Sequence, residues 1–402
     1  MEEKRKLDLL SIASVPLVMT LGNSMLIPLL PVMEDKLKIS SLQSSLIITV
    51  YSVIAIILIP ITGYLSDRYG RKKVIIPSLI LTAIGGLIAG LAAMLFDQSY
   101  YWILLGRFIQ GIGSSGAFPV VLPLVGDMFK DDQQVSSSLG LIETSNTVGK
   151  VLSPILGALL GMITWYVPLL AIPVFSAVSL VLVFFLLKAP DKQEEPMPFG
   201  EFLQNVKRIL LEKGRWLFAV FAIGCILMYV LFGVLFYLST LLEDDYHITG
   251  VIKGLILAVP LLALSIASFI TGKKIGENKP LMKWLSFSGC LLLSVSVFVI
   301  SFSEHADLLI IGLVFSGIGI GLALPCLDAF ITSGIEKQQR GTISSIYSSM
   351  RFIGVAVGPP LFAMIIKLSH QVLFLSTAGI CVVASILALL SIRPANQQQK
   401  VK

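Results

Sequence analysis

The chain contains a series of apolar runs, each about as long as a membrane span, separated by short charged segments. A helix needs roughly 20 apolar residues to cross the hydrocarbon of a bilayer, so a chain of 402 residues has room for about twelve such helices. The composition agrees, because 55% of the residues are hydrophobic and only 13% are charged, against about 25% charged in soluble domains. A soluble enzyme, a nucleic-acid-binding protein and a disordered scaffold are therefore disfavoured.

The apolar runs predict twelve membrane-spanning helices in two groups of six. Their approximate limits are 9–32, 44–66, 74–96, 101–126, 136–160, 164–187, 215–240, 252–272, 284–303, 308–330, 341–366 and 371–392. The polar stretch at residues 188–214 separates the two groups. We therefore predict an all-α integral membrane protein with one six-helix bundle at residues 1–187, a cytoplasmic linker at 188–214, and a second bundle at 215–402.

The basic residues predict the orientation of these spans. With the N-terminus in the cytoplasm, most of the 30 lysines and arginines fall on the cytoplasmic side, as the positive-inside rule requires. The external loops then hold four lysines, namely Lys36, Lys38, Lys253 and Lys367. Both termini are expected in the cytoplasm. Short loops and the lack of a recognisable targeting segment favour a multi-pass protein of a bacterial plasma membrane.

The two halves share small sequence features. Gly149 and Pro154 recur in the second half as Gly354 and Pro359. Asp127 and Asp328 each follow a proline near the predicted cytoplasmic end of a span. Parallel repeats of this kind are typical of transporters, in which the substrate site lies between the halves near the middle of the membrane.

A glycine- and charge-rich loop joins the second and third predicted spans. Its order is Gly-x-x-x-Asp-Arg-x-Gly-Arg, formed by Gly63, Asp67, Arg68, Gly70 and Arg71. A simple positively charged loop would not need this order. The segment is similar to the loop signature of the major facilitator superfamily, and the chain resembles that family over its whole length. The resemblance implies the major facilitator fold and a role for this loop as a conformational latch between the halves.

The fifth predicted span carries a second pattern, formed by Gly140, Gly149, Pro154 and Gly157. Small residues allow helices to approach closely, and a proline bends a helix. Packing alone could explain each glycine separately, but the complete spacing resembles the antiporter signature of the family's drug/proton exporter branch. It differs from that signature at Ser153 and Ala158. This resemblance favours export over import.

Four charged residues lie well inside predicted spans, namely Arg107, Glu143, Lys150 and Arg351. Intramembrane charges are costly and usually functional. Glu143 and Lys150 share one face of the fifth span, two turns apart. We predict that Glu143 carries the proton, and resemblance to the family's arginine motif implies that Arg107 takes part in proton coupling. The alternatives are a static ion pair of Glu143 with Lys150 or Arg351, and an Arg107 that extends to the outer membrane interface.

A substrate cavity is predicted from polar and aromatic residues of several spans, namely Asn23, Lys150, Tyr229 and Arg351. The aromatic side chains of the seventh span could instead serve packing. The predicted function is proton-coupled export of amphipathic small molecules, drugs or metabolites by alternating access. A dedicated exporter of an anionic metabolite such as a siderophore is an alternative, because three intramembrane cations outnumber one acid, and a facilitated importer is another.

No catalytic or metal-binding pattern accompanies these features. The three histidines fall in predicted external loops without metal-ligand spacing, so an enzyme is not expected and no cofactor is predicted. The expected partners are a small-molecule substrate, protons and the lipid bilayer, without nucleic acid. Two six-helix halves form a complete pathway, so a monomer suffices.

Overall fold

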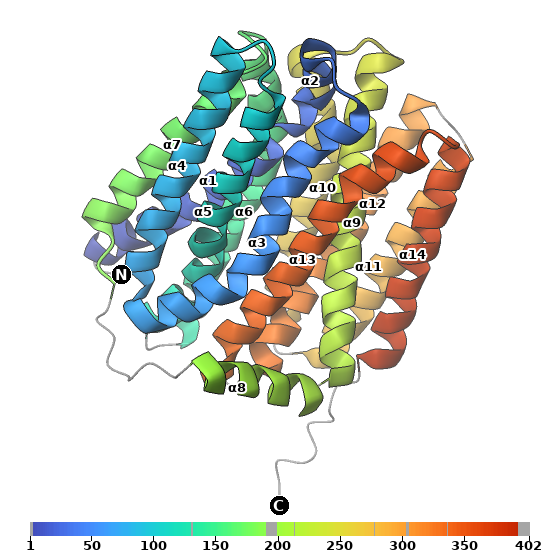
Figure 1. Cartoon of the computed structure of the whole chain (residues 1–402). Helices are drawn as coiled ribbons and strands as arrows, with labels where there is room; N and C mark the ends of the chain where they lie inside the picture. Colours follow the sequence, from blue (N-terminus) through green and yellow to red (C-terminus); the bar gives the residue numbers. More distant parts are fainter. Residues whose placement is uncertain are drawn as a thin grey trace, which may run out of the picture.

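The computed structural model describes residues 3–129, 132–189, 199–212, 214–276, 278–302, 305–335 and 337–392. These residues form helices joined by short connections (Figure 1). The helices are α1 (Glu3–Ser24), η1 (Ile27–Leu29, a 3-10 turn), α2 (Leu30–Leu37), α3 (Ser41–Tyr69), α4 (Arg71–Leu95), α5 (Tyr100–Met128), α6 (Asp132–Gly161), α7 (Val167–Leu186), α8 (Phe199–Glu212), α9 (Gly214–Asp244), α10 (Gly250–Ile275), α11 (Lys279–Ile300), α12 (Ala306–Gly334), α13 (Lys337–Ile365) and α14 (His370–Ser391).

The described helices supply the twelve predicted spans, with α1, η1 and α2 together forming the first. Eleven of the spans in the described part of the chain are both long and apolar enough to cross a membrane. The twelfth is α6, which is 30 residues long but carries charged and polar side chains, among them Glu143 and Lys150. This span thus carries two of the four charged residues that were predicted inside spans.

Local sequence explains where several of these helices begin, end or bend. Pro28 lies in η1, where α1 has ended and α2 has not begun, because proline lacks the amide hydrogen that a continuing helix needs. Ser40 and Gln43 form a reciprocal capping box that starts α3. Gly70 joins α3 to α4 with a φ of 101°, a conformation that favours glycine.

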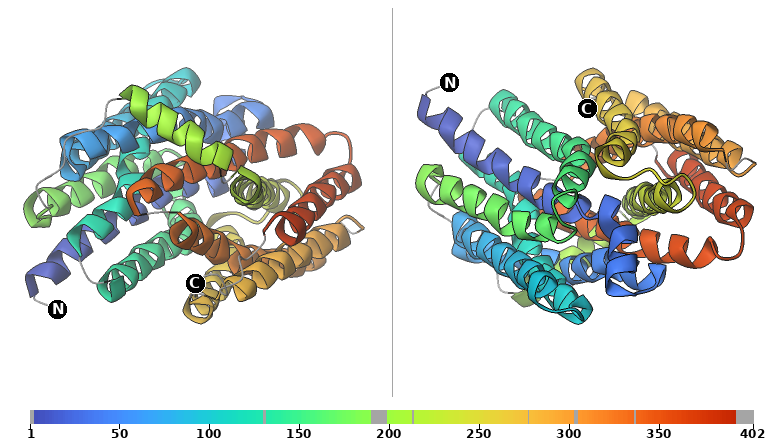
Figure 2. Two further views of the ribbon diagram at one scale, coloured as in Figure 1. Left: turned by 90° about the horizontal axis from the view of Figure 1, so that it is seen from below. Right: turned by 90° about the horizontal axis from the view of Figure 1, so that it is seen from above.

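The helices pack as two groups that meet along two pairs of helices. Helices α1 to α7 (the first half) pack mainly on one another, as do α9 to α14 (the second half), and the groups lie side by side in Figures 1 and 2. Between them, α3 packs against α13 and α6 against α10. The Thr49 hydroxyl donates to the Ala356 carbonyl at 2.7 Å, and the Ser239 hydroxyl donates to the Ile27 carbonyl at 2.9 Å.

The predicted linker at 188–214 contains the amphipathic helix α8. This helix lies across one end of the bundle and contacts the start of α9 (Figures 1 and 2). Ile209 is buried, whereas Leu211 on the same helix is exposed. The rest of the linker, residues 190–198 and 213, lies outside the described residues.

Candidate functional site

Four charged side chains gather where α6 of the first half faces α12 and α13 of the second half; we call them the four-charge cluster. On α6, the Lys150 ammonium lies 4.0 Å from the Glu143 carboxylate. On the second half, the Arg351 guanidinium on α13 lies 3.5 Å from the Asp328 carboxylate on α12. The structure therefore brings together Glu143, Lys150 and Arg351, as predicted, and adds Asp328.

The acids and the bases of the four-charge cluster differ in exposure. The Glu143 and Asp328 side chains are 43% and 39% exposed, whereas those of Lys150 and Arg351 are only 13% and 19% exposed. Both ion-pair distances are close to the outer limit for direct contact. The carboxylates are thus more accessible than the cations that they hold.

Neutral side chains orient each pair. The Asn146 amide donates to Glu143 at 3.2 Å, and the Thr20 hydroxyl of α1 donates to the Asn146 oxygen at 2.7 Å. On the second half, the Arg351 guanidinium lies 5.6 Å from the centre of the Tyr347 ring. A side chain at Gly224 would meet both Tyr347 and Arg351, so the arginine stem lies directly against α9.

The two pairs act as one electrostatic unit. Asp328 interacts with the charges of Arg351, Lys150 and Glu143, and Lys150 interacts with those of Glu143, Arg351 and Asp328. Two acids and two bases give this cluster no net formal charge. Glu143 was the one acid expected well inside a span, but Asp328, near the end of the predicted span 308–330, also belongs to the cluster.

Arg107 on α5 lies in a different setting and is fully buried. Its guanidinium donates to the carbonyl oxygens of Ile47 at 2.9 Å and Gly22 at 3.0 Å, and to the Asn23 side-chain oxygen at 2.8 Å. It also donates to Gln110 at 2.6 Å. Among the described residues, no carboxylate forms an ion pair with it.

These contacts correct one alternative for Arg107 and locate Asn23. The guanidinium points into the bundle and joins α1, α3 and α5, so it does not extend to the outer interface. It also lies 4.4 Å from the centre of the Tyr51 ring, a cation–π contact. Asn23 is buried, and its oxygen accepts from Arg107 at a point where α1 ends.

The predicted latch residues form an ion-paired network at the turn between α3 and α4. Arg71 lies 2.6 Å from Asp67 and 2.9 Å from Asp127 at the end of α5, and it also donates to the Ser66 hydroxyl. Arg68 is exposed beside the ring of Tyr69 and takes no part in these ion pairs.

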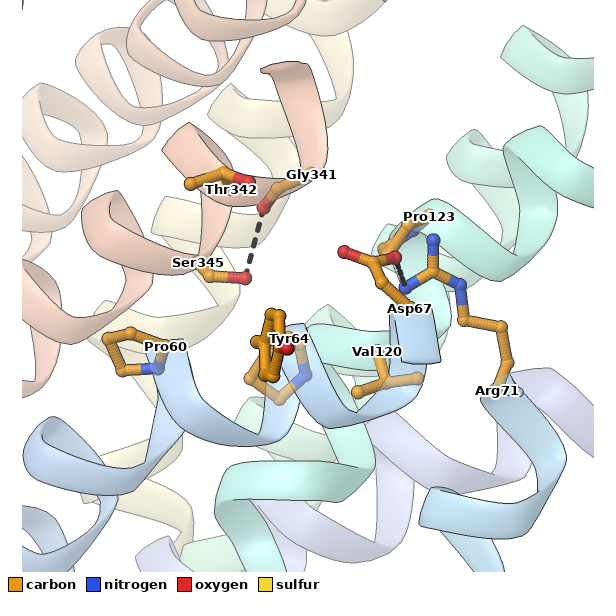
Figure 3. Close-up of a pocket in the computed structure, with 11 residues that line it drawn as sticks. Pro60, Tyr64, Asp67, Arg71, Val120, Pro123, Gly341, Thr342 and Ser345 are labelled. Carbon is orange, nitrogen blue, oxygen red and sulfur yellow. Dashed lines mark hydrogen bonds and ion pairs between the residues drawn. The ribbon is translucent and has the colours of Figure 1, made fainter. Parts of the chain in front are cut away.

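The latch network lies beside the second half of the molecule. A Cβ on Gly63 would lie 3.0 Å from the Ser345 hydroxyl of α13, so this glycine permits a close approach between the halves. Figure 3 shows Asp67 and Arg71 on one side of a small pocket and Gly341, Thr342 and Ser345 on the other. The loop therefore lies where a relative movement of the halves would change its contacts.

The antiporter-pattern residues pack α6 against its neighbours. A Cβ on Gly149 would lie 3.1 Å from Thr20, and one on Gly157 would overlap the Met25 carbonyl. The Pro154 carbonyl faces Gly254 of α10 in the second half. Gly140 has open space around it. Three members of the pattern therefore fit α6 between α1 and α10.

The predicted cavity residue Tyr229 lies in the packed core of the second half. Its side chain is buried and its ring centre lies 5.6 Å from that of Phe362. Phe236 and Tyr237 of the same helix are buried as well. The described geometry of this aromatic stripe is that of helix packing.

Two further polar residues occupy unexpected positions. Lys253, predicted in an external loop, is almost completely buried in the first turn of α10 and lies 2.6 Å from Glu243 at the end of α9. His370 was also expected in an external loop, but it begins α14 with its ring between the Tyr237 hydroxyl, at 2.7 Å, and the Ile300 carbonyl. Both residues follow a loop directly, so hydropathy alone assigns them to the water side.

The helical architecture is that of a multi-span membrane protein, and comparison with known proteins identifies the family. The sequence matches the Major Facilitator Superfamily over residues 12–359 and 283–402. The chain therefore belongs to the Major Facilitator Superfamily, and its twelve-helix fold is the fold of that family.

Individual relatives are exporters or resistance proteins. The chain is 52% identical over 394 residues to the bacillibactin exporter of Bacillus subtilis (strain 168), with 98% of each chain covered. It is 26% identical to the class H tetracycline resistance protein of Pasteurella multocida, covering 87% of this chain and 86% of that protein. It is also 24% identical to multidrug resistance protein 3 of Bacillus subtilis (strain 168), covering 78% of this chain and 70% of that protein.

Solved structures show the same fold. The human organic anion transporter MFSD10 matches with a TM-score of 0.77 and 19% identity, covering 96% of this chain and all of that one. A bacterial homologue of the human lysosomal transporter Spinster matches with a TM-score of 0.78 and 15% identity, covering 98% of each chain. Within the described residues, no group of three or more His, Cys, Asp or Glu is arranged to hold a metal ion.

Proposed function

We propose that this protein is a proton-coupled exporter of a siderophore, with bacillibactin as the first cargo to test. The observation that carries this proposal is 52% identity to a bacillibactin exporter over 98% of both chains. The siderophore alternative is thus favoured over broad drug export. The three sequence relatives described above are named as an exporter or as resistance proteins, which also disfavours a facilitated importer.

The proposed mechanism is alternating access with the four-charge cluster as the coupling site. The halves rock along the α3–α13 and α6–α10 contacts, and the cluster lies between them. Glu143 takes a proton from the outer side and releases it to the cytoplasm, because its carboxylate is partly exposed and only loosely paired. Proton entry then drives cargo outward.

Arg107 contributes by positioning the first span. It holds Gly22 and Asn23 where α1 ends, and Thr20 on that helix supports Asn146, which donates to Glu143. This chain of contacts connects a buried arginine to the proposed proton carrier. Asn23, Lys150 and Arg351 remain proposed cargo contacts, and Tyr229 is proposed to support the cavity wall through Phe362.

The charge balance of the cluster bears on the cargo. With Asp328 included, the cluster has two acids and two bases, so counting intramembrane charges no longer favours an anion. We propose that the cargo binds without net charge, or with its charges paired against both signs. A second candidate function, export of drugs such as tetracycline, is favoured by the more distant resistance-protein relatives.

The proposed setting is the cell membrane, with the protein acting as a monomer and both termini in the cytoplasm. Reporter fusions test the orientation: a cytoplasm-active reporter at either end should be active, and a reporter that works only outside should be silent. The reverse pattern would contradict the proposed topology.

Everted membrane vesicles test the function. Vesicles carrying the protein should accumulate bacillibactin when a proton gradient is imposed, and an uncoupler should abolish accumulation. Tetracycline, tested in parallel, separates the two candidate cargoes. Bacillibactin uptake that ignores the uncoupler would overturn proton coupling, and uptake of tetracycline alone would overturn the siderophore assignment.

A further inference from the structure

Asp328 is the member of the four-charge cluster that was not predicted from the sequence as a site residue. The charged or titratable side chains that face it are Arg351 and Tyr347 on α13 and Glu143 and Lys150 on α6, with Cys326 on its own helix. Its carboxylate is 39% exposed and lies 3.5 Å from Arg351. The acid is therefore only partly exposed, and it holds the arginine at the outer limit of direct contact.

The related helix of the first half, α5, also carries an acid, but at a different distance from the helix end. In the first half, Asp127 lies one residue before the end of α5 and pairs with Arg71 of the latch at 2.9 Å. The second-half loop at residues 272–279 has no aspartate in the latch position. Asp328 instead turns to Arg351, deeper in the bundle. The acid of α12 thus lies farther from the end of its helix than the acid of α5 and has a different partner.

Each half therefore contributes one acid and one base to the interface between the halves. Glu143 and Lys150 belong to α6, while Asp328 and Arg351 belong to α12 and α13. Each cation interacts with both carboxylates, including the one on the opposite half. A movement of one half relative to the other changes the distances between charges on opposite halves. The distance between the acid and the base of each pair does not change, because both belong to the same half.

We propose that Asp328 is a second positioning residue of the coupling site. As the halves move, Asp328 and Glu143 exchange their cationic partners, Arg351 and Lys150. In the arrangement seen here, the Asp328 side chain accepts an N–H of Arg351. When Asp328 takes a proton from water, the carboxylic acid loses its charge and releases Arg351 toward Glu143. The proton returns to water when the halves reverse, and Arg351 pairs again with Asp328. This inference rests on the proposed proton-coupled export.

Substitutions at Asp328 test its role in everted vesicles. Asp328→Asn should lower proton-driven bacillibactin uptake by on the order of tenfold or more and flatten its pH profile. Asp328→Glu should retain uptake and move the pH profile of uptake to higher pH, because glutamate holds its proton more tightly than aspartate. Asp307→Asn, an exposed acid in the first turn of the same helix, is the matched control and should leave both unchanged.

Cargo exchange without a proton gradient separates coupling from folding. Asp328→Asn should lose much less bacillibactin counterflow than gradient-driven uptake; in counterflow, labelled cargo exchanges with unlabelled cargo across the vesicle membrane. Uptake and a pH profile equal to wild type in both Asp328 variants would overturn the inference, while gradient-driven uptake by wild type would leave the proposed function intact. A wild-type protein without gradient-driven uptake would instead overturn the proposed function.

A double-substitution comparison tests the exchange itself. If Asp328 interacts with Lys150 during the cycle, the double variant Asp328→Asn with Lys150→Gln should transport no worse than the poorer single variant. Fully multiplicative losses would contradict partner exchange and leave Asp328 as a static partner of Arg351. Should Asp328→Asn fail to accumulate in the membrane, the shifted pH profile of Asp328→Glu decides, and an unshifted profile overturns the inference.

Discussion

The buried Arg107 site and the four-charge cluster hold intramembrane charges in opposite ways. Arg107 is fully buried and donates four hydrogen bonds to groups of α1, α3 and α5, each between 2.6 and 3.0 Å. In the cluster, the two ion pairs measure 3.5 and 4.0 Å, and both carboxylates are partly exposed. The Arg107 site thus has short hydrogen bonds within one half of the molecule. The four-charge cluster has longer ion pairs, and each pair faces the opposite half.

This difference separates structure from mechanism. A charge with short bonds to backbone carbonyls stabilises a single arrangement, because any movement breaks several charge-assisted hydrogen bonds. Loosely paired charges at an interface can change partners at little cost. We therefore expect substitutions at Arg107 to reduce stability first, and substitutions in the cluster to reduce coupling while the protein remains folded.

The largest expected effect is at Glu143. Glu143→Gln should abolish proton-driven bacillibactin uptake in everted vesicles, because the amide cannot carry a proton through the cycle. Counterflow should persist, and so should the amount of protein in the membrane. Glu212→Gln on α8, an exposed position, is the control. Retained gradient-driven uptake in Glu143→Gln would place proton coupling elsewhere.

Arg107 should respond as a structural residue. Arg107→Gln removes several charge-assisted hydrogen bonds, each worth about 1.5–3 kcal/mol, and leaves buried carbonyls of Gly22 and Ile47 unpaired. The purified variant should unfold at a clearly lower temperature than wild type, and Arg107→Lys should lie between them. If Arg107→Gln keeps the wild-type unfolding temperature and loses only pH dependence, the distinction between the two sites is wrong.

The close contact between α1 and α6 should be sensitive to side-chain size. Gly157→Leu would force a side chain into the Met25 backbone and should destabilise the protein by about 1–3 kcal/mol. Gly140→Ala on the same helix should change little, because its surroundings are open. Thermal unfolding of the two variants provides the comparison, and equal stability would argue against tight packing at Gly157.

The smallest stability effect is expected in the latch. Asp67 is partly exposed, and ion pairs of this kind contribute about 0–1 kcal/mol. Asp67→Asn should therefore leave the unfolding temperature nearly unchanged while slowing uptake, since the residue acts on the movement of the halves. Addition of salt should mimic part of this slowing in wild type. A large drop in unfolding temperature would make Asp67 a structural residue.

Apolar runs bounded by charges were sufficient to predict the spans, because the bilayer allows few ways to satisfy the backbone. The major facilitator fold followed from the resemblance of the loop sequence. The loop order around Asp67 was equally informative, since its residues act locally. Asp328 was not predicted as a site residue, because sequence alone does not show that its carboxylate approaches Arg351 of another helix. The burial of Lys253 depends on Glu243 of another helix, and no local pattern reports such a contact.

Proton release on cargo binding is the most direct measurement of the central claim, that the four-charge cluster couples cargo to protons. Bacillibactin would be added to purified protein in weakly buffered detergent solution while the pH is recorded. Wild type should release protons, Glu143→Gln and Asp328→Asn should release fewer, and Asp307→Asn should match wild type. Release that is the same in wild type and in both cluster variants, or no release from wild type that binds bacillibactin, would contradict the account.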